Sequence, residues 1–275
     1  MSTASGARRS REVGAPSAAL QEKSGAVNST ADRAIDILLL FSEERPRWTL
    51  QEIAAHFGMP RTTSYRYINS LRAYALIVED EKGGYRLGPR IFPLARIARA
   101  GISILNVAAP ALEALNATFG EAVTFYERVD QEVIALTRLE CRHRVRLTYI
   151  RGQLLPWPAT ASSKVLLANA ALDEQQALLR LMEPVRYTRK TVASLKALRQ
   201  VLERIRRQGY AYSDEERDQG VRGIAAPVFA GRRARYCISL SGPTFRLTDA
   251  KLPEMFAAVK NAAMSLSEAL RSPEC

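Results

Sequence analysis

Two places in this chain bring together residues that could perform nucleophilic chemistry. Cys141 and His143 lie two residues apart, which on a strand places both side chains on one face. No acidic residue is placed to orient that imidazole, as an activated Cys–His pair requires. Ser162 and Ser163 precede Lys164, but position 161 is alanine, so the Ser-x-x-Lys spacing is absent. We therefore predict that the chain is not an enzyme.

Metal chemistry is not indicated either. The chain has two histidines, His56 and His143, and three widely spaced cysteines, Cys141, Cys237 and Cys275, without a CxxC pair. Protein zinc sites are built mainly from these two residue types. An odd number of scattered cysteines is typical of a reducing compartment. We predict no metal, no cofactor and a cytoplasmic location. No apolar run approaches the roughly 18–20 residues of a membrane span, and the arginines near the N-terminus precede no signal-peptide core.

A different chemistry is indicated between Gly58 and Leu76, where no acidic residue occurs. Arginine matches guanine edges and phosphates, and threonine methyl groups can contact thymine. A surface that faces the phosphate backbone should exclude carboxylates. The formal net charge of +12 favours an anionic partner, although the excess is spread along the chain. The residues that we predict to contact DNA are Arg61, Thr62, Thr63, Tyr65, Arg66 and Asn69.

These residues need a helix that presents them, and the flanking sequence provides it. Thr49 and Glu52 have capping-box spacing, which predicts the start of a short amphipathic helix. Gly58 ends that helix, and Pro60 suits the first turn of a second helix over 61–74. Two short helices joined by a tight turn form the plan of a helix-turn-helix. The inner face of the second helix is predicted to hold Tyr67, Ile68, Leu71 and Tyr74.

An upstream helix and a following hairpin complete the predicted domain. Asn28 or Ser29 can cap a helix whose apolar residues recur at helical spacing as far as Phe41. Strands over 76–78 and 85–87, with a polar turn between them, predict a wing. A helix-turn-helix with one polar face is also an ordinary αα-hairpin, but the extra helix and the wing favour DNA binding. We predict a disordered tail over 1–28 and a winged helix-turn-helix domain over 29–88.

The rest of the chain predicts a linker helix over 89–101 and an α+β domain over 102–275 with an antiparallel sheet. The linker and the helix over 104–119 carry apolar stripes without an obvious partner in a single chain, which predicts a homo-oligomer. A row of arginines (Arg142, Arg144 and Arg146) on one strand is more often a solvated face than a ligand site. The remaining helices are predicted over 159–171, 173–182, 194–208 and from a cap at Thr248 to about 270, and the strands over 122–128, 133–139, 144–150, 210–213, 223–229 and 236–241.

The chain resembles the IclR family of bacterial transcriptional regulators along nearly its full length. The resemblance is carried in the first domain by ADRAIDILLLF, TLQEIAAHFGMPRTTSYRYINSL and GGYRLGPR. In the second it is carried by LLPWPATASSKVLLA, QGYAYSDEERDQGVRGIAAPVF and ISLSGP. It implies a regulator whose binding to a double-stranded DNA operator is controlled by a small carboxylic or aromatic acid, and which forms homodimers or tetramers. The alternatives are a DNA-binding protein whose second domain only assembles subunits, and a small-molecule hydrolase.

The resemblance also implies where the acid binds. Ser239 and Ser241 alternate on a strand, so their hydroxyl groups share a face, and the helix start at Ser162 favours an anion. The serines could instead pair with neighbouring backbone, and Asp214 could accept from a ligand hydroxyl or cap a turn. The sequence departs from the family pattern at Ser64, Ala75 and, in the pocket, Gly223, where many relatives have cysteine. The predicted effector-binding residues are Thr160, Ala161, Ser162, Asp214, Val221, Gly223, Ser239 and Ser241.

Overall fold

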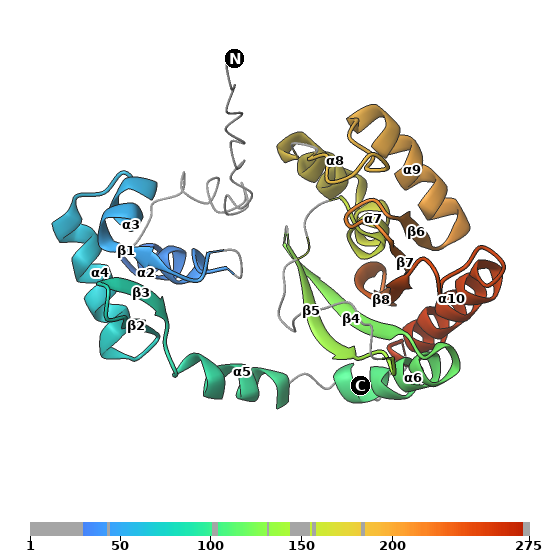
Figure 1. Ribbon diagram of the computed structural model, residues 1–275, viewed down its shortest axis with the longest axis horizontal. Coiled ribbons are helices and arrows are strands. Elements are labelled where there is room, and N and C mark those ends of the chain that lie inside the picture. Colours follow the sequence, from blue (N-terminus) through green and yellow to red (C-terminus); the bar gives the residue numbers. More distant parts are fainter. Residues whose placement is uncertain are drawn as a thin grey trace, which may run out of the picture. The chain divides into compact units, whose positions relative to one another are not determined.

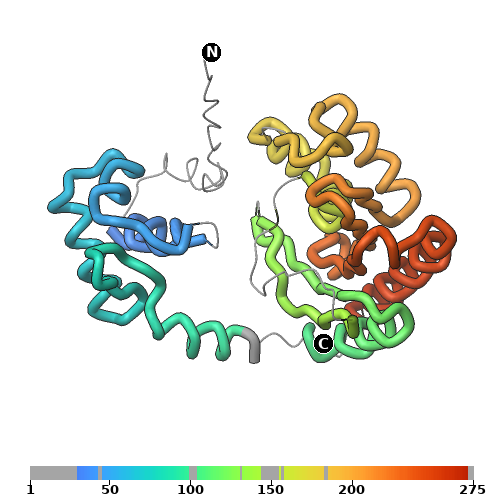
Figure 2. Tube along the Cα trace, in the orientation of Figure 1, coloured from blue at the N-terminus to red at the C-terminus, as the bar shows by residue number. Residues whose placement is uncertain are grey.

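The computed structural model describes residues 30–42, 45–100, 104–130, 132–143, 155, 158–182 and 185–271. The chain divides into two compact units, residues 1–99 and 100–275, which are considered separately (Figures 1 and 2). The predicted tail, the cap at Asn28 or Ser29, and the predicted strand with Arg144 and Arg146 lie outside the described residues.

In the described part of the first unit, helices α2, α3 and α4 precede or flank a small antiparallel sheet of strand order β1-β3-β2, and α5 follows it (Figure 1). This confirms the predicted upstream helix, helix-turn-helix and wing. A third strand, β1, joins the wing and was not predicted. The helices are α2 (Thr30–Leu39), α3 (Leu50–His56) and α4 (Arg61–Ala73), and the strands are β1 (Trp48–Thr49), β2 (Ile77–Glu79) and β3 (Gly84–Leu87).

Local chemistry explains the helix-turn-helix. The Thr49 hydroxyl accepts from the Glu52 N–H at 3.3 Å, and the Glu52 carboxylate accepts from the Thr49 N–H at 2.8 Å, which is the predicted capping box. Gly58 follows α3 with a φ of +60°, a conformation that glycine adopts without steric cost. Ser64, where the family pattern has an apolar residue, is fully buried, and its hydroxyl donates to the Pro60 carbonyl at 3.2 Å. The hydroxyl is therefore accommodated in the core.

The inner face of α4 matches the prediction except at its end. Tyr67, Ile68 and Leu71 are buried, whereas Tyr74 is 69% exposed, so its assignment to the core was wrong. The physical reason is that α4 ends at this residue, and Ala75 then turns the chain with a φ of +55°. The buried side chains that pack with α4 come from α2 and the residue after it, from α3 and from the three strands: Ile37, Leu40, Trp48, Ile53, Ile77 and Tyr85.

The helix that follows the wing, α5 (Ile91–Ala100), exposes large apolar side chains. Phe92 is 79% exposed, Leu94 50% and Ile97 60%. Leu94 and Ile97 are three residues apart and are therefore neighbours on one side of the helix, whereas Phe92 points to another side.

Within the described residues, the second unit forms an antiparallel sheet of five strands in the order β5-β4-β8-β7-β6, with helices on both faces. Helices α6 and α10 share one hydrophobic core with the sheet, and α7, α8 and α9 share a second core on the other face. The architecture confirms the predicted α+β class. The strands are β4 (Ala122–Val129), β5 (Glu132–Leu139), β6 (Ala211–Asp214), β7 (Val221–Ala230) and β8 (Arg233–Pro243), and the helices are α6 (Ile104–Phe119), α7 (Ala161–Ala168), α8 (Leu172–Leu181), α9 (Leu195–Gln208) and α10 (Leu252–Ala269).

Alternation along β8 divides its side chains between the two cores. Ile238 and Leu240 pack in the core with α6 and α10. Cys237 packs in the core with α7, and Ser239 and Ser241 share its face. The strand therefore places two hydroxyl groups on the side of the sheet that α7 covers.

The ends of α9 and α10 can be compared with the predicted helix ends. The helix predicted over 194–208 is α9, which Ser194 caps and Gly209 ends with a φ of +80°. The predicted cap of the last helix was wrong. Helix α10 begins at Leu252, and the Thr248 carbonyl accepts from the N–H groups of Lys251 and Leu252, so Thr248 forms the turn before the helix. None of the helices in the described ranges is long and apolar enough to cross a membrane.

Candidate functional site

Helix α4 presents one polar face opposite its buried one. Ser64, Tyr67, Ile68 and Leu71 are buried, which fixes the rotation of the helix in the first unit. The predicted DNA-contacting residues fall within the other half of the helical circumference. They are exposed, except for Thr63, which is half-buried at the edge of the face: Arg61, Thr62, Tyr65, Arg66 and Asn69.

Arg47 fixes the wing next to this helix. Its Nε donates to the Asp80 carboxylate at 2.5 Å, and its Nη2 donates to the Lys82 carbonyl at 3.1 Å. The Arg47 hydrogen bond, followed by the Gly84 N–H, holds the pKa of Asp80 well below its ordinary range. The wing also exposes Lys82 and Arg86, two cations that the sequence reasoning did not assign to the DNA surface.

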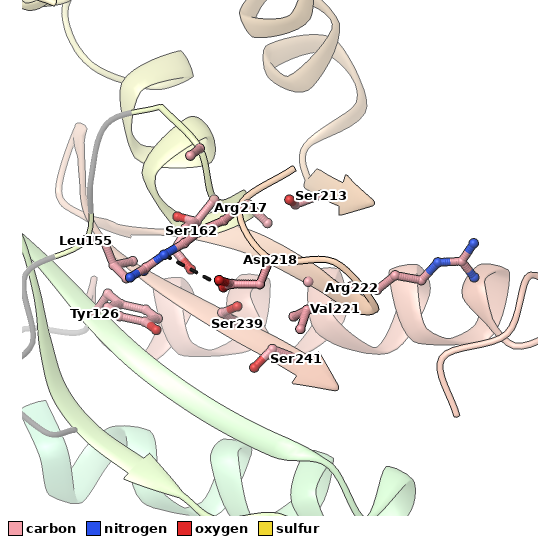
Figure 3. Close-up of a pocket in the computed structure, with 14 residues that line it drawn as sticks. Tyr126, Leu155, Ser162, Ser213, Arg217, Asp218, Val221, Arg222, Ser239 and Ser241 are labelled. Atoms are coloured by element: carbon pink, nitrogen blue, oxygen red, sulfur yellow. Dashed lines mark ion pairs between the residues drawn. The ribbon is translucent and has the colours of Figure 1, made fainter. Parts of the chain in front are cut away.

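The second unit contains a cavity of about 50 Å³ at the start of α7 (Figure 3). This is several times the ~10–15 Å³ that one water molecule occupies by the same measure, so a small ligand fits. The cavity brings together the α7 start, strands β6, β7 and β8, and the segment between β6 and β7. Its lining residues are Tyr126, Leu155, Ala159, Thr160, Ala161, Ser162, Ser213, Arg217, Asp218, Val221, Arg222, Gly223, Ser239 and Ser241.

The start of α7 is organised by a second capping box. Thr160 Oγ1 accepts from the Ser163 N–H at 3.1 Å, and Ser163 Oγ accepts from the Thr160 N–H at 3.2 Å. Ser163 is therefore engaged in the cap. Ala161 and Ser162 occupy the first turn of α7, where N–H groups have no partner within the helix. Gly223 of β7 approaches this turn closely, and a Cβ added to it would lie 3.8 Å from that of Ala161. A cysteine there, as in many relatives, would narrow the cavity.

Four serine hydroxyl groups face this cavity, from Ser162, Ser213, Ser239 and Ser241 (Figure 3). The first three residues are nearly fully buried, at 3%, 6% and 6% exposure. Within the described part of the chain, none of the four hydroxyl groups hydrogen-bonds to a protein atom. The alternative that the β8 serines pair with neighbouring backbone is therefore not observed there. The hydroxyl groups are therefore available to donate to, or accept from, a polar ligand in the cavity.

Asp214 is the one predicted effector residue that does not line the cavity. Its carboxylate accepts from Lys190 at 2.8 Å and from Arg222 at 2.8 Å. Burial favours the neutral acid, but these two hydrogen bonds outweigh it and lower the pKa of Asp214. Its neighbour Ser213 faces the cavity instead, because successive residues of a strand point to opposite faces. Sequence reasoning also missed Tyr126, Leu155, Arg217 and Asp218. Leu155, Arg217 and Asp218 lie within motifs that carry the family resemblance, which could have indicated them.

Lys164 connects α7 to the segment that follows β6. It is 1% exposed, and its ammonium group donates to the Glu216 carboxylate and to the Tyr212 carbonyl at 3.0 Å. Burial lowers the pKa of Lys164 and raises that of Glu216. Lys164 is thus a buried structural cation, and its ammonium group does not activate Ser162 or Ser163.

The candidate nucleophile Cys141 and the second described cysteine, Cys237, are both buried. The Cys141 thiol is buried and contacts the backbone carbonyl of His143 at 3.5 Å. Burial raises the pKa of Cys237, whose thiol contacts the Ser162 carbonyl at 3.9 Å. Among the described residues, no group of three or more potential ligands could hold a metal ion.

Two family models match the chain over the parts that carry these two sites. The IclR helix-turn-helix domain matches residues 30–81, and the bacterial transcriptional regulator IclR C-terminal domain matches residues 98–268. The chain belongs to the IclR family of transcriptional regulators.

Relatives within the IclR family are similar over nearly the whole chain. The transcriptional regulator BhcR of Paracoccus denitrificans is 34% identical and covers 94% of this chain and 93% of its own. The regulator XynR of Escherichia coli is 32% identical, over 89% of this chain and 98% of its own. The repressor IclR of the same species is 28% identical, over 95% of each chain. The chain is accordingly a DNA-binding transcriptional regulator of the IclR family rather than an enzyme.

Solved structures show the same architecture. A transcriptional regulator of this family from Silicibacter has a TM-score of 0.79 at 25% identity, with coverage of 88% of this chain and 96% of its own. An IclR homologue from Microbacterium hydrocarbonoxydans in complex with 4-hydroxybenzoate has a TM-score of 0.70 at 25% identity, with coverage of 88% and 99%.

Proposed function

We propose that this regulator binds a small carboxylic or aromatic acid in the cavity at the start of α7, and that the bound acid changes its affinity for an operator. The observation that carries the proposal is the set of four serine hydroxyl groups that face the cavity and have no hydrogen-bond partner among the described residues. A carboxylate offers several acceptor sites to such donors, and hydrogen bonds to a charged group are about twice as strong as neutral ones.

Two further observations support an acid. The N-terminus of α7 lies at the cavity wall, and the positive end of a helix dipole favours an anion. In addition, the Microbacterium homologue holds 4-hydroxybenzoate, which carries a carboxylate and a hydroxyl group.

On the DNA side, we propose that the exposed face of α4 reads the operator in the major groove. The supporting observation is that Arg61, Thr62, Tyr65, Arg66 and Asn69 are exposed together on a helix whose opposite face is buried. Thr63, at the edge of this face, would contact the DNA backbone.

We further propose a cytoplasmic homo-oligomer. A single short recognition helix covers few base pairs, so specific binding requires two half-sites on a dimer. The apolar side chains of Phe92, Leu94 and Ile97 on α5 give the chain a surface that a second copy could cover. Light scattering at micromolar concentration should give at least twice the monomer mass, and a monomeric mass would contradict the proposal.

Thermal unfolding with and without a panel of aliphatic and aromatic carboxylic acids tests the effector proposal. A ligand that binds only the folded state raises the Tm, and at 100 times its Kd it stabilises by about 2.7 kcal/mol. We expect at least one acid to raise the Tm and to change operator affinity. A second domain that only assembles subunits would leave both quantities unchanged for every acid.

A further inference from the structure

Three charged residues line the cavity: Arg217, Asp218 and Arg222. The guanidinium group of Arg222 is engaged outside it. Its Nε donates to Asp214 at 2.8 Å and its Nη1 donates to the Leu247 carbonyl at 2.7 Å. In Figure 3 this group points away from the serines of β8. Arg222 therefore contributes to the cavity wall, but its charge is matched elsewhere.

The Arg217 side chain lies in the cavity together with Asp218 (Figure 3). Its Nε is 3.8 Å from Asp218 Oδ2, compared with 2.8 Å between Arg222 and Asp214. The Arg217 side chain is only 21% exposed, whereas that of Asp218 is 50% exposed. The cation is thus mostly inside the protein, and its acidic neighbour lies at the solvent-accessible rim.

The backbone on either side of this pair is held in place. On the N-terminal side, the Glu216 carboxylate binds the buried Lys164, and the Glu216 carbonyl accepts from the Thr191 hydroxyl at 2.6 Å. Around the C-terminal side, a Glu215 carboxylate oxygen accepts from the Gly220 N–H at 2.8 Å. The arginine and aspartate side chains can therefore change partners without movement of the segment that carries them.

We propose that Arg217 makes the cavity selective for anions and that Asp218 is a resident counterion, which the carboxylate of the ligand displaces. The inference rests on the proposed function and assigns the charge selectivity of the cavity to Arg217. The serines supply only neutral donors, and a carboxylate taken into a cavity requires a matching charge. A guanidinium group supplies two parallel N–H donors in the geometry of a carboxylate. Asp218, once displaced, is exposed enough to recover its hydration.

The test uses the full chain and isothermal titration calorimetry. The probes are acetate, lactate, benzoate and 4-hydroxybenzoate, each measured beside its uncharged amide. The variants are Arg217→Gln, Arg217→Lys and Asp218→Asn. Arg199→Gln, which changes an exposed arginine on α9 that does not line the cavity, is the matched control.

Arg217→Gln should weaken binding of the best acid by about 10- to 100-fold, as expected for one charge-assisted interaction. The affinity for the matching amide should stay within about threefold. Arg217→Lys should restore part of the acid affinity, because lysine keeps the positive charge but lacks the two parallel N–H donors of a guanidinium group. Asp218→Asn should strengthen acid binding several-fold, and the control should behave as wild type.

Different contrary results would overturn different parts of the proposal. Unchanged acid affinity in Arg217→Gln overturns the role of Arg217 and leaves the proposed function standing. An equal loss for acid and amide also overturns it, because the arginine would then only support the cavity. Weaker acid binding in Asp218→Asn overturns the counterion role. A wild-type chain that binds none of the acids overturns both this inference and the proposed function.

Discussion

Simultaneous replacement of Ser239 and Ser241 by alanine removes two of the hydroxyl groups that face the cavity. Each would donate to the bound carboxylate, and a hydrogen bond to a charged group contributes about 1.5–3 kcal/mol. The two residues lie on one strand and share a ligand, so their contributions will not be strictly additive. Since each 1.4 kcal/mol is a tenfold change, we expect acid binding at least ~100-fold weaker.

The same structure predicts an unusual effect on stability. Ser239 is 6% exposed, and neither hydroxyl group bonds to a protein atom within the described residues. Removal of a hydroxyl group that makes no hydrogen bond to the protein should not destabilise the fold. We therefore expect the ligand-free Tm of the double variant to equal or exceed that of wild type. Ser265→Ala, on the exposed side of α10, is the matched control and should change neither quantity.

The assays are calorimetry with the acid that gives the largest Tm increase, and fluorescence anisotropy with operator DNA in its absence. Loss of acid affinity with operator binding near wild type is the expected combination. Intact acid affinity would show that the acid binds elsewhere. A lower ligand-free Tm would show that the hydroxyl groups support the fold, and the reasoning from their missing partners would be refuted.

Three other changes test the first unit. Arg66→Ala should weaken operator binding by about 1–3 kcal/mol if the guanidinium group holds a guanine. An equal loss of affinity for unrelated DNA in anisotropy titrations would indicate a phosphate contact instead. Asp80→Asn should lower the Tm at pH 7, because the folded-state pKa of Asp80 is depressed and the ionised carboxylate stabilises the fold. The difference in Tm from wild type should shrink as the pH falls below the ordinary Asp pKa of 3.8, since acid removes that stabilisation. A pH-independent difference in calorimetric melting curves would contradict this. Gly88→Ala should destabilise the unit by about 1–3 kcal/mol, since the added Cβ would lie 2.2 Å from the Ala75 carbonyl oxygen. An unchanged denaturation midpoint would show that this contact relaxes freely.

Local signals made the helix-turn-helix predictable. The capping box at Thr49, the positive φ of Gly58 and the start of α4 after Pro60 depend on residues within a few positions of each other. The same is true of Ser194 and Gly209 at the ends of α9. The errors occurred where a long-range contact or the exact end of a helix decides the outcome. Strand β1 has only two residues and exists because Trp48 pairs with Tyr85 across the wing.

The cavity was predictable in its regular elements and not in its irregular ones. The alternation of Ser239 and Ser241 on β8 follows from the strand period, and Ser162 follows from a helix start. Arg217 and Asp218 lie in a segment without regular structure, so no periodicity indicates where their side chains point. The segment is held by long-range contacts of its neighbours, among them the ion pair of Glu216 with Lys164 of α7 and the hydrogen bond of the Thr191 hydroxyl to the Glu216 carbonyl.

Operator affinity as a function of acid concentration tests the central claim most directly. Duplexes selected from a random library by the protein supply the operator, and fluorescence anisotropy gives the Kd at zero and at saturating acid. Coupling between two sites on one protein is typically 5- to 150-fold, so we predict a change of at least about fivefold for wild type and none for the Ser239→Ala, Ser241→Ala variant at the same acid concentration. An acid that binds in the cavity while the operator Kd of wild type stays constant would contradict control of DNA binding by this site.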